Sequence, residues 1–242
     1  MAENTSASAG KRRLAKSGII RIVTISAAML VQAAVFFVAA GRIDIPRGWI
    51  YYGATFVYFL IALPTLFLLF PTVLDLVNER GRFKQDTKTW DKVWGGLYTV
   101  MLVVIPGVAG FDVGRLGGPD VSAALIVPSL VVTILAYVFV HWAMVVNRYA
   151  ETGVRIQQDR GHEVVSTGPY RCVRHPFYVS IIVTQLAYPL ALGSLAAYVP
   201  VVVLIALVVW RTAMEDRTLH AELPGYAEYA KRTRHRLLPG VW

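Results

Sequence analysis

The chain has a single cysteine, Cys172, among its 242 residues. One cysteine excludes an intramolecular disulfide and a metal cluster built on cysteine ligands. Its thiol could act as a nucleophile, but a small residue that fills a position in a loop is the commoner case and is our interpretation. We expect no metal site.

Charged residues are also scarce, at 16% of the chain against about 25% in soluble proteins. Hydrophobic residues account for 56%, and the mean hydropathy is positive. This composition excludes a soluble domain and indicates an all-α integral membrane protein. Six apolar windows have about the length that crosses a bilayer, and they cover residues 19–40, 49–70, 94–111, 123–146, 177–192 and 196–210.

The last two of these windows are the shortest. Gly193 and Ser194 separate them, which predicts a helical hairpin that barely crosses the bilayer or forms a tilted pair. Several prolines lie in or near the windows. They are compatible with spanning helices, because neighbouring helices can satisfy the freed backbone groups.

Basic residues number 24, and their distribution predicts the orientation of the chain. Of these, 21 lie at the start of the first window or in alternate segments after it, and only Arg42, Arg47 and Arg115 lie in the other loops. The positive-inside rule then predicts six crossings with both termini in the cytoplasm. Nucleic acid is not an expected partner, since its binding proteins gather their basic residues in one stripe.

Polar residues are concentrated in the cytoplasmic segments. Residues 1–18 are rich in Ser, Ala, Lys and Arg and are expected to be disordered. A transporter or channel would place ionisable groups near the middle of its spans, and here only His141 is a candidate. We expect that histidine to be hydrogen-bonded to a neighbour. Any chemistry therefore belongs at the cytoplasmic interface.

The most distinctive segment is the loop of residues 168–178, with the sequence Gly-Pro-Tyr-Arg-Cys-Val-Arg-His-Pro-Phe-Tyr. Two prolines and a glycine fix its backbone, while two arginines and a histidine supply hydrogen-bond donors beside an uncharged run. The simple interpretation is a juxtamembrane loop whose arginines contact lipid headgroups. The alternative is a binding loop at the membrane surface.

A second cluster closes the last window. Arg211 and Glu215 are four residues apart and share one face of a continuous helix. Taken alone they indicate a surface ion pair that contributes about 0.3–0.5 kcal/mol. Residues 219–229 then have the spacing of an amphipathic helix broken at Pro224 and Gly225, and a basic segment at residues 231–236 suits anionic headgroups.

Taken in order, these motifs resemble the isoprenylcysteine carboxyl methyltransferase (ICMT) family. The resemblance covers residues 147–242, and bacterial members also have elements like those at residues 78–80 and 90–92. Phospholipid N-methyltransferases share part of the pattern. The matching motifs are His-Glu-Val-Val at 162–165, Pro-Tyr at 169–170, Arg-His-Pro-Phe-Tyr at 174–178, Arg211 with Glu-Asp at 215–216, and Gly-Tyr-Ala-Glu-Tyr at 225–229.

The resemblance implies an S-adenosylmethionine cofactor in a membrane-embedded helical fold. In keeping with this, the chain lacks the G-x-G-x-x-G motif of nucleotide-binding sheets. Arg211 matches the family's arginine that meets the substrate carboxylate and is the expected catalytic residue. The family usually has Glu-Glu at 215–216, so the role of Asp216 is open. The expected cofactor-binding residues are Gln157, His162, Glu163, Val164, Val165, Tyr170, His175, Pro176, Phe177, Tyr178 and Glu215.

The residue types suit this cofactor. Glu215 can pair with its ammonium group, and Tyr170 and Tyr178 offer ring faces to a cation or to adenine. A carboxylate acceptor is already anionic at neutral pH and needs no general base, so positioning and partial removal of water would do most of the work. Arg211 would orient such an acceptor through a bidentate fork.

The expected function is methylation of a lipophilic acceptor from the bilayer, with carboxyl O-methylation of an isoprenylcysteine-like or lipid substrate as first choice. N-methylation of a phospholipid amine and S-methylation of a small thiol are alternatives within the class. An NADPH-dependent membrane reductase of the sterol type and a non-enzymatic membrane scaffold are alternatives outside it. We expect a bacterial plasma membrane protein with a basic N-terminus (1–18), N-terminal membrane helices (19–146) and a methyltransferase core (147–242).

Overall fold

The computed structural model describes residues 14–79 and 86–242, and within these ranges the chain is helical, without strands. Three short 3-10 helices accompany the α-helices, η1 (Ala123–Leu125), η2 (Gln158–Arg160) and η3 (Gly168–Arg171). The α-helices are α1 (Lys16–Ala40), α2 (Pro46–Leu69), α3 (Pro71–Glu79), α4 (Thr89–Arg115), α5 (Ile126–Val146), α6 (Pro176–Leu192), α7 (Tyr198–Glu222) and α8 (Tyr226–Arg232).

Five helical segments are long and apolar enough to cross a membrane, which confirms the all-helical membrane fold. They are α1, α2, α4, α7 and the segment Ala123–Val146, and α6 is a shorter apolar helix of 17 residues. The expectation of a short final window is wrong for α7, which has 25 residues. Hydropathy falls at Arg211, but the helix continues to Glu222 because its polar residues there find partners inside the protein.

Helix boundaries differ from the hydropathy windows for the same reason. The charged residues Asp91 and Asp112 are buried within α4, so this helix is longer at both ends than the window 94–111. α1 begins at Lys16, inside the segment expected to be disordered, whereas residues 1–13 lie outside the described residues. The short amphipathic helix α3 was not expected.

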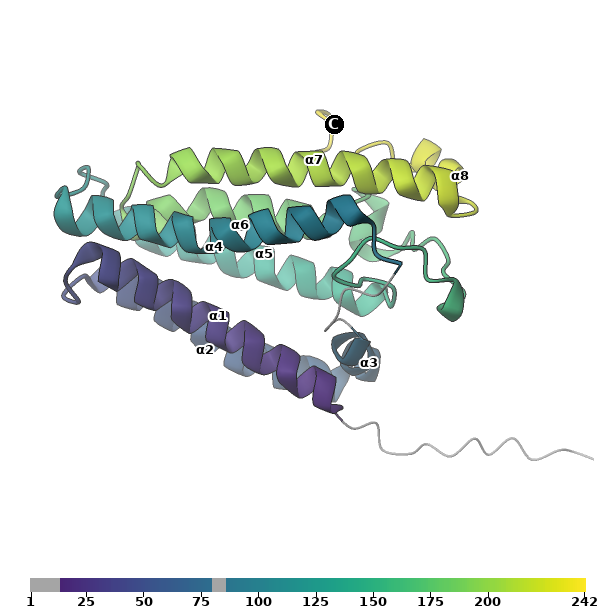
Figure 1. Ribbon diagram of the computed structural model, residues 1–242, viewed down its shortest axis with the longest axis horizontal. Coiled ribbons are helices and arrows are strands. Elements are labelled where there is room, and N and C mark those ends of the chain that lie inside the picture. Colours follow the sequence, from purple (N-terminus) through teal and green to yellow (C-terminus); the bar gives the residue numbers. More distant parts are fainter. Residues whose placement is uncertain (1–13, 80–85) are drawn as a thin grey trace, which may run out of the picture.

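The helices form a bundle with two distinct ends (Figure 1). One end, here called the loop end, carries α3, α8 and the segment 147–175. The other end, the hairpin end, carries the connections at residues 41–45, 116–122 and 193–197. α4, α5, α6 and α7 pack as one group, and α1 and α2 lie against it at a tilt.

α1 and α4 touch closely only near the hairpin end. A Cβ atom added at Gly110 would lie 2.0 Å from the carbonyl oxygen of Phe36, and one at Gly114 would lie 2.4 Å from that of Ala40. Glycines at these positions therefore let the two backbones meet, as small residues do in membrane helix pairs. Toward the loop end the two helices diverge (Figure 1).

The turn between α6 and α7 is held by buried polar groups. Asp112 accepts a hydrogen bond from the Ser194 hydroxyl at 2.6 Å and another from the backbone N of Ala196 at 3.2 Å. Gly193 ends α6 with a φ of 80°, and the Arg47 side chain packs against it. These contacts confirm the predicted helical hairpin.

His141 is hydrogen-bonded to a neighbour, as the sequence predicted. Its Nδ1 atom lies 2.8 Å from the Tyr58 hydroxyl, and the two rings stack at 5.7 Å. The pair joins α2 to α5. This histidine therefore has a structural role in the bundle.

Candidate active site

A cavity of about 610 Å³ lies at the loop end. Its walls come from α1, α4, the segment 147–165, the start of α6 and the region from α7 to α8. A volume of roughly 300–1,000 Å³ is usual for small-molecule sites. All twelve residues expected at the site line this one cavity: Gln157, His162, Glu163, Val164, Val165, Tyr170, His175, Pro176, Phe177, Tyr178, Arg211 and Glu215.

Glu215 lies on α7 between the side chains of the loop 168–178. Its Oε2 atom accepts a hydrogen bond from the Tyr178 hydroxyl, and its Oε1 atom lies 3.9 Å from Nδ1 of His175. The His175 ring stacks on the Tyr178 ring, with centroids 5.7 Å apart. The Glu215 side chain is 23% exposed, so its carboxylate is held in place and still faces the cavity.

Asp216, one residue further on, is fully enclosed by cations and hydroxyls. It accepts hydrogen bonds from Arg174 at 2.8 and 3.1 Å, from Arg236 at 2.8 Å and from the Tyr226 hydroxyl at 2.8 Å. His175 Nε2 lies 3.2 Å from the same carboxylate. Asp216 thus ties α7 to the loop 168–178, to α8 and to the C-terminal tail. This is the role of the second acid that the sequence left open.

The carboxylate of Asp216 shifts the pKa values of two of its partners, Arg174 and Tyr226. Burial alone would lower the pKa of the Arg174 guanidinium, but the hydrogen bonds and charge of Asp216 raise it above its usual value. Burial, followed by the charge of Asp216, raises the pKa of Tyr226. The simple interpretation of lipid-facing arginines is therefore wrong for Arg174, which faces the protein interior.

Arg211 is buried, which contradicts the prediction of a surface ion pair with Glu215. Its Nε atom lies 2.9 Å from Oδ1 of Asp91, its Nη2 atom donates to the Thr152 carbonyl at 2.7 Å, and its guanidinium sits 3.9 Å from the Trp94 ring centroid. Asp91 is wholly inaccessible to solvent. The i, i+4 pattern identified the right face of α7 but the wrong partner.

The segment 147–165 forms the wall opposite α7. Gln157 is buried, and its amide donates to the Tyr149 carbonyl at 2.6 Å and accepts from Arg160 at 3.0 Å. The His162 ring lies against the Tyr149 ring at 4.6 Å. Burial, and then the charge of Arg155, lowers the pKa of His162 and so favours its neutral ring.

The C-terminal region holds the loop 168–178 from outside. The backbone N atoms of Arg174 and His175 donate to the carbonyls of His235 and Arg236 at 2.9 and 3.0 Å. The Tyr229 hydroxyl donates to the Tyr170 carbonyl at 2.7 Å. Val164, Val165 and Phe177 pack against the apolar cluster of Tyr170, Leu223, Tyr226 and Tyr229. In the basic tail segment, Arg236 turns inward to Asp216.

Several residues that the sequence did not single out complete the cavity. Trp94 and Tyr98 come from α4, Tyr149 comes from the segment after α5, and Arg21 comes from α1. Aromatic and basic residues are frequent in membrane helices near the interface, so their position in the sequence carries no specific signal. Only the packing of α1 and α4 brings them to the site.

In the part of the chain that the structure describes, the fold is that of a helical membrane protein with a large cavity at the loop end. Residues 125–221 match the Isoprenylcysteine carboxyl methyltransferase (ICMT) family, a span from η1 to the last turn of α7 that contains all twelve expected residues. No curated protein matches the chain. This segment is similar to that family, and the match, together with five helices long and apolar enough to cross a membrane, supports an integral membrane methyltransferase.

Proposed function

We propose that the protein transfers a methyl group from S-adenosylmethionine to a lipophilic acceptor, with carboxyl O-methylation of an isoprenylcysteine-like or lipid substrate as first candidate. One observation carries the proposal: the twelve residues from three separate segments line one cavity. Polar side chains line it toward the loop end, and Ala28, Leu102 and Ile181 line it from membrane helices. Such a cavity suits a polar cofactor from the cytoplasm and an apolar acceptor from the bilayer.

The residues present fit this cofactor. Glu215 offers a carboxylate to an ammonium group, and Tyr178, His175 and Tyr170 offer ring faces or hydrogen bonds to a cation and to adenine. When bound, S-adenosylmethionine supplies an electrophilic methyl group on a sulfonium. The contacts of Glu215 with Tyr178 and His175 hold its carboxylate in place before the cofactor binds. This lowers the entropy cost of ordering the side chain on binding.

Arg211 is the residue that would orient an anionic acceptor. Asp91 and Thr152 accept hydrogen bonds from its Nη2 atom, and Nε lies 2.9 Å from Asp91 Oδ1 without a hydrogen bond. Among the described residues none accepts a hydrogen bond from Nη1, which can meet an acceptor in the cavity. Trp94 beneath the guanidinium fixes its plane. The side chain is thus preorganised, and no general base is needed for a carboxylate.

One observation favours a second candidate, methylation of a neutral amine or thiol. Asp91 already balances the charge of Arg211, so an uncharged acceptor would leave no unpaired cation at this wall. A bacterial plasma membrane with both termini in the cytoplasm remains our proposal for location. The orientation rests on the basic residues that cluster at the loop end, and the bacterial membrane rests on the resemblance to the family.

The Arg211–Asp91 pair decides between the candidates. Arg211→Ala alone would strand the buried Asp91 charge, so the test replaces both groups by amides, Arg211→Gln with Asp91→Asn. For a carboxylate acceptor, we expect turnover to fall about tenfold or more, while S-adenosylmethionine affinity stays within about twofold. Turnover is measured with labelled cofactor on a prenylated cysteine, on phosphatidylethanolamine and on a long-chain thiol.

The matched control removes another ion pair that joins the start of α4 to the end of α7. Lys88 and Glu222 meet at 2.6 Å on the surface, and Lys88→Gln with Glu222→Gln should leave turnover unchanged. If the Arg211–Asp91 variant keeps full turnover on the prenylated cysteine, Arg211 does not orient a carboxylate. Activity on the amine or thiol alone would assign the second candidate.

A further inference from the structure

Four arginines line the cavity, and three of them are neutralised by carboxylates of the protein. Asp216 pairs with Arg174 and Asp91 pairs with Arg211. The third, Arg155, is held by Glu151 at 2.8 Å and by two further carboxylates, those of Asp86 and Asp159. The fourth, Arg21, has no hydrogen bond or ion pair with any residue in the ranges 14–79 and 86–242.

Arg21 is half-buried in the second turn of α1. It lines the cavity together with Thr24, Ile25 and Ala28, which share its face of the helix. Trp94 and Tyr98 of α4 line the same cavity. Removing a guanidinium from water without a partner is unfavourable. A ligand that supplies a negative charge here would remove this cost.

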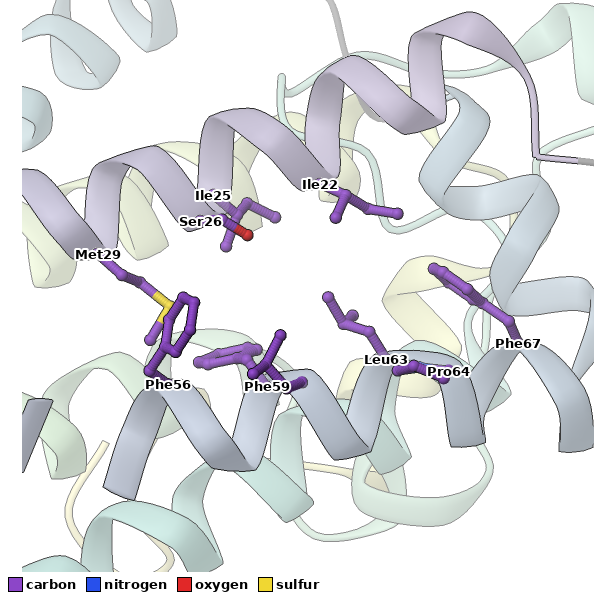
Figure 2. Close-up of a pocket in the computed structure, with 10 residues that line it drawn as sticks. Ile22, Ile25, Ser26, Met29, Phe56, Phe59, Leu63, Pro64 and Phe67 are labelled. Carbon is purple, nitrogen blue, oxygen red and sulfur yellow. The ribbon is translucent and has the colours of Figure 1, made fainter. Parts of the chain in front are cut away.

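A second, apolar pocket of about 140 Å³ lies on the adjacent face of α1. Figure 2 shows Ile22, Ile25 and Met29 of α1 facing Phe56, Phe59 and Leu63 of α2 across it. Ser26 is its one polar side chain. Ile25 lines both this pocket and the large cavity, so the two share a wall one turn beyond Arg21. An amphiphile could therefore place its charged head at Arg21 and its apolar tail in the adjacent pocket.

We propose that Arg21 and the α1–α2 pocket form an acceptor subsite. Arg21 would bind a carboxylate or phosphate of an amphiphilic lipid, separate from the group that receives the methyl, and the pocket would take its hydrocarbon tail. The inference rests on the proposed methyl transfer, and it names an anionic amphiphile as the substrate class. α1 and α2 lie outside the segment matched to the ICMT family. This subsite would therefore be a specificity element supplied by the N-terminal half of the chain.

Equilibrium binding to the full chain in uncharged detergent tests the subsite. The probes are hexadecanoate, hexadecyl phosphate and hexadecanol, which share one tail length and differ in head charge. Arg21→Gln should weaken the binding of whichever anion Arg21 recognises, hexadecanoate or hexadecyl phosphate, about tenfold or more. The affinity for hexadecanol should stay within about twofold of the wild-type value. Arg21→Lys should retain part of the affinity, since it keeps the charge and loses the planar fork.

The control is Lys16→Gln, which removes an exposed basic residue of the same helix that does not line the cavity. Lys16→Gln should leave the affinity for all three probes unchanged. A loss confined to hexadecanoate or to hexadecyl phosphate identifies the anion. Ser26→Phe, which fills the apolar pocket, should weaken all three probes alike.

Equal losses for the anions and the alcohol in Arg21→Gln, or the same loss in Lys16→Gln, would overturn the subsite. Full hexadecanol affinity in a folded Ser26→Phe protein would exclude the tail from the α1–α2 pocket. An S-adenosylmethionine titration of the same preparations separates the two proposals. Loss of cofactor binding by the wild-type protein contradicts methyl transfer, whereas the probe series decides the role of Arg21 independently.

Discussion

At the scale of single residues, the neighbours Glu215 and Asp216 show how environment separates two acids. The Asp216 side chain is 1% exposed and contacts four cationic or polar side chains, whereas Glu215 is 23% exposed and faces the cavity. Asp216 holds the site together, and Glu215 is left for a ligand. Substitution of Asp216 should therefore lower the stability of the protein, whereas substitution of Glu215 should chiefly weaken ligand binding.

We expect Asp216→Asn to lower the free energy of unfolding by about 3–5 kcal/mol, because it leaves Arg174 buried without a counter-charge. The measurement is the denaturant midpoint of the purified protein in detergent. Glu222→Gln, at an exposed pair on the same helix, should cost about 1 kcal/mol or less. An Asp216→Asn protein as stable as Glu222→Gln would remove Asp216 from its anchoring role.

Residue patterns singled out side chains that come together in space, but not the contacts between them. All twelve expected residues line one cavity, and their role in binding stays a prediction. The partner of Arg211 was missed because Asp91 lies 120 residues away, and helix periodicity reports only neighbours within one or two turns. Arg174 was visible in the loop motif, but its partner Asp216 was not.

At the scale of helices, the contact between α1 and α4 sets the shape of the cavity. The glycines at positions 110 and 114 bring the two backbones together near the hairpin end. From there the helices diverge toward the loop end (Figure 1), and Arg21 and Thr24 of α1 and Trp94 of α4 line the cavity.

Gly110→Ala should separate the two helices, since its Cβ atom would overlap the Phe36 backbone. We expect a loss of about 1–3 kcal/mol in unfolding free energy, as for other overpacked sites. Gly96→Ala is the matched control on the same helix, because no atom lies within 4 Å of its Cβ position. It should be neutral or stabilising by about 1 kcal/mol. Equal stability of the two variants would contradict the close contact.

Hydropathy predicted most helices but not their ends. Polar residues near the ends of α4 and α7 interrupt the apolar windows, yet Asp112 and Asp216 are buried and hydrogen-bonded to other segments of the fold. Only tertiary partners make such residues compatible with a buried helix. The sequence did not predict the short helix α3, because nine residues give only a weak hydrophobic periodicity.

At the scale of the whole molecule, the loop end should face the cytoplasm, since it carries most of the basic residues. Cys172 is exposed in this region and is the chain's one cysteine, which makes it a natural probe. A membrane-impermeant maleimide should label it in inverted membranes and not in intact cells. In a Cys172→Ser background, cysteines placed at residues 8 and 235 should behave in the same way. Labelling of any of the three cysteines from outside intact cells would contradict a cytoplasmic loop end.

The site spans both halves of the chain. The family match covers α5, α6 and α7, while α1 and α4 supply the wall with Arg21, Trp94 and Tyr98. The C-terminal half contains most of the segment that matches the ICMT family. The N-terminal half is where we place selectivity for the acceptor.

The most direct test of the central claim is binding of labelled S-adenosylmethionine to the purified full chain in detergent. The account predicts saturable binding that NADPH does not compete for. His175→Ala and Tyr178→Ala should each weaken it about tenfold or more, the effect of one or two lost contacts. Absence of binding, selective binding of NADPH, or unchanged affinity in folded variants of His175 and Tyr178 would contradict a cofactor site in this cavity.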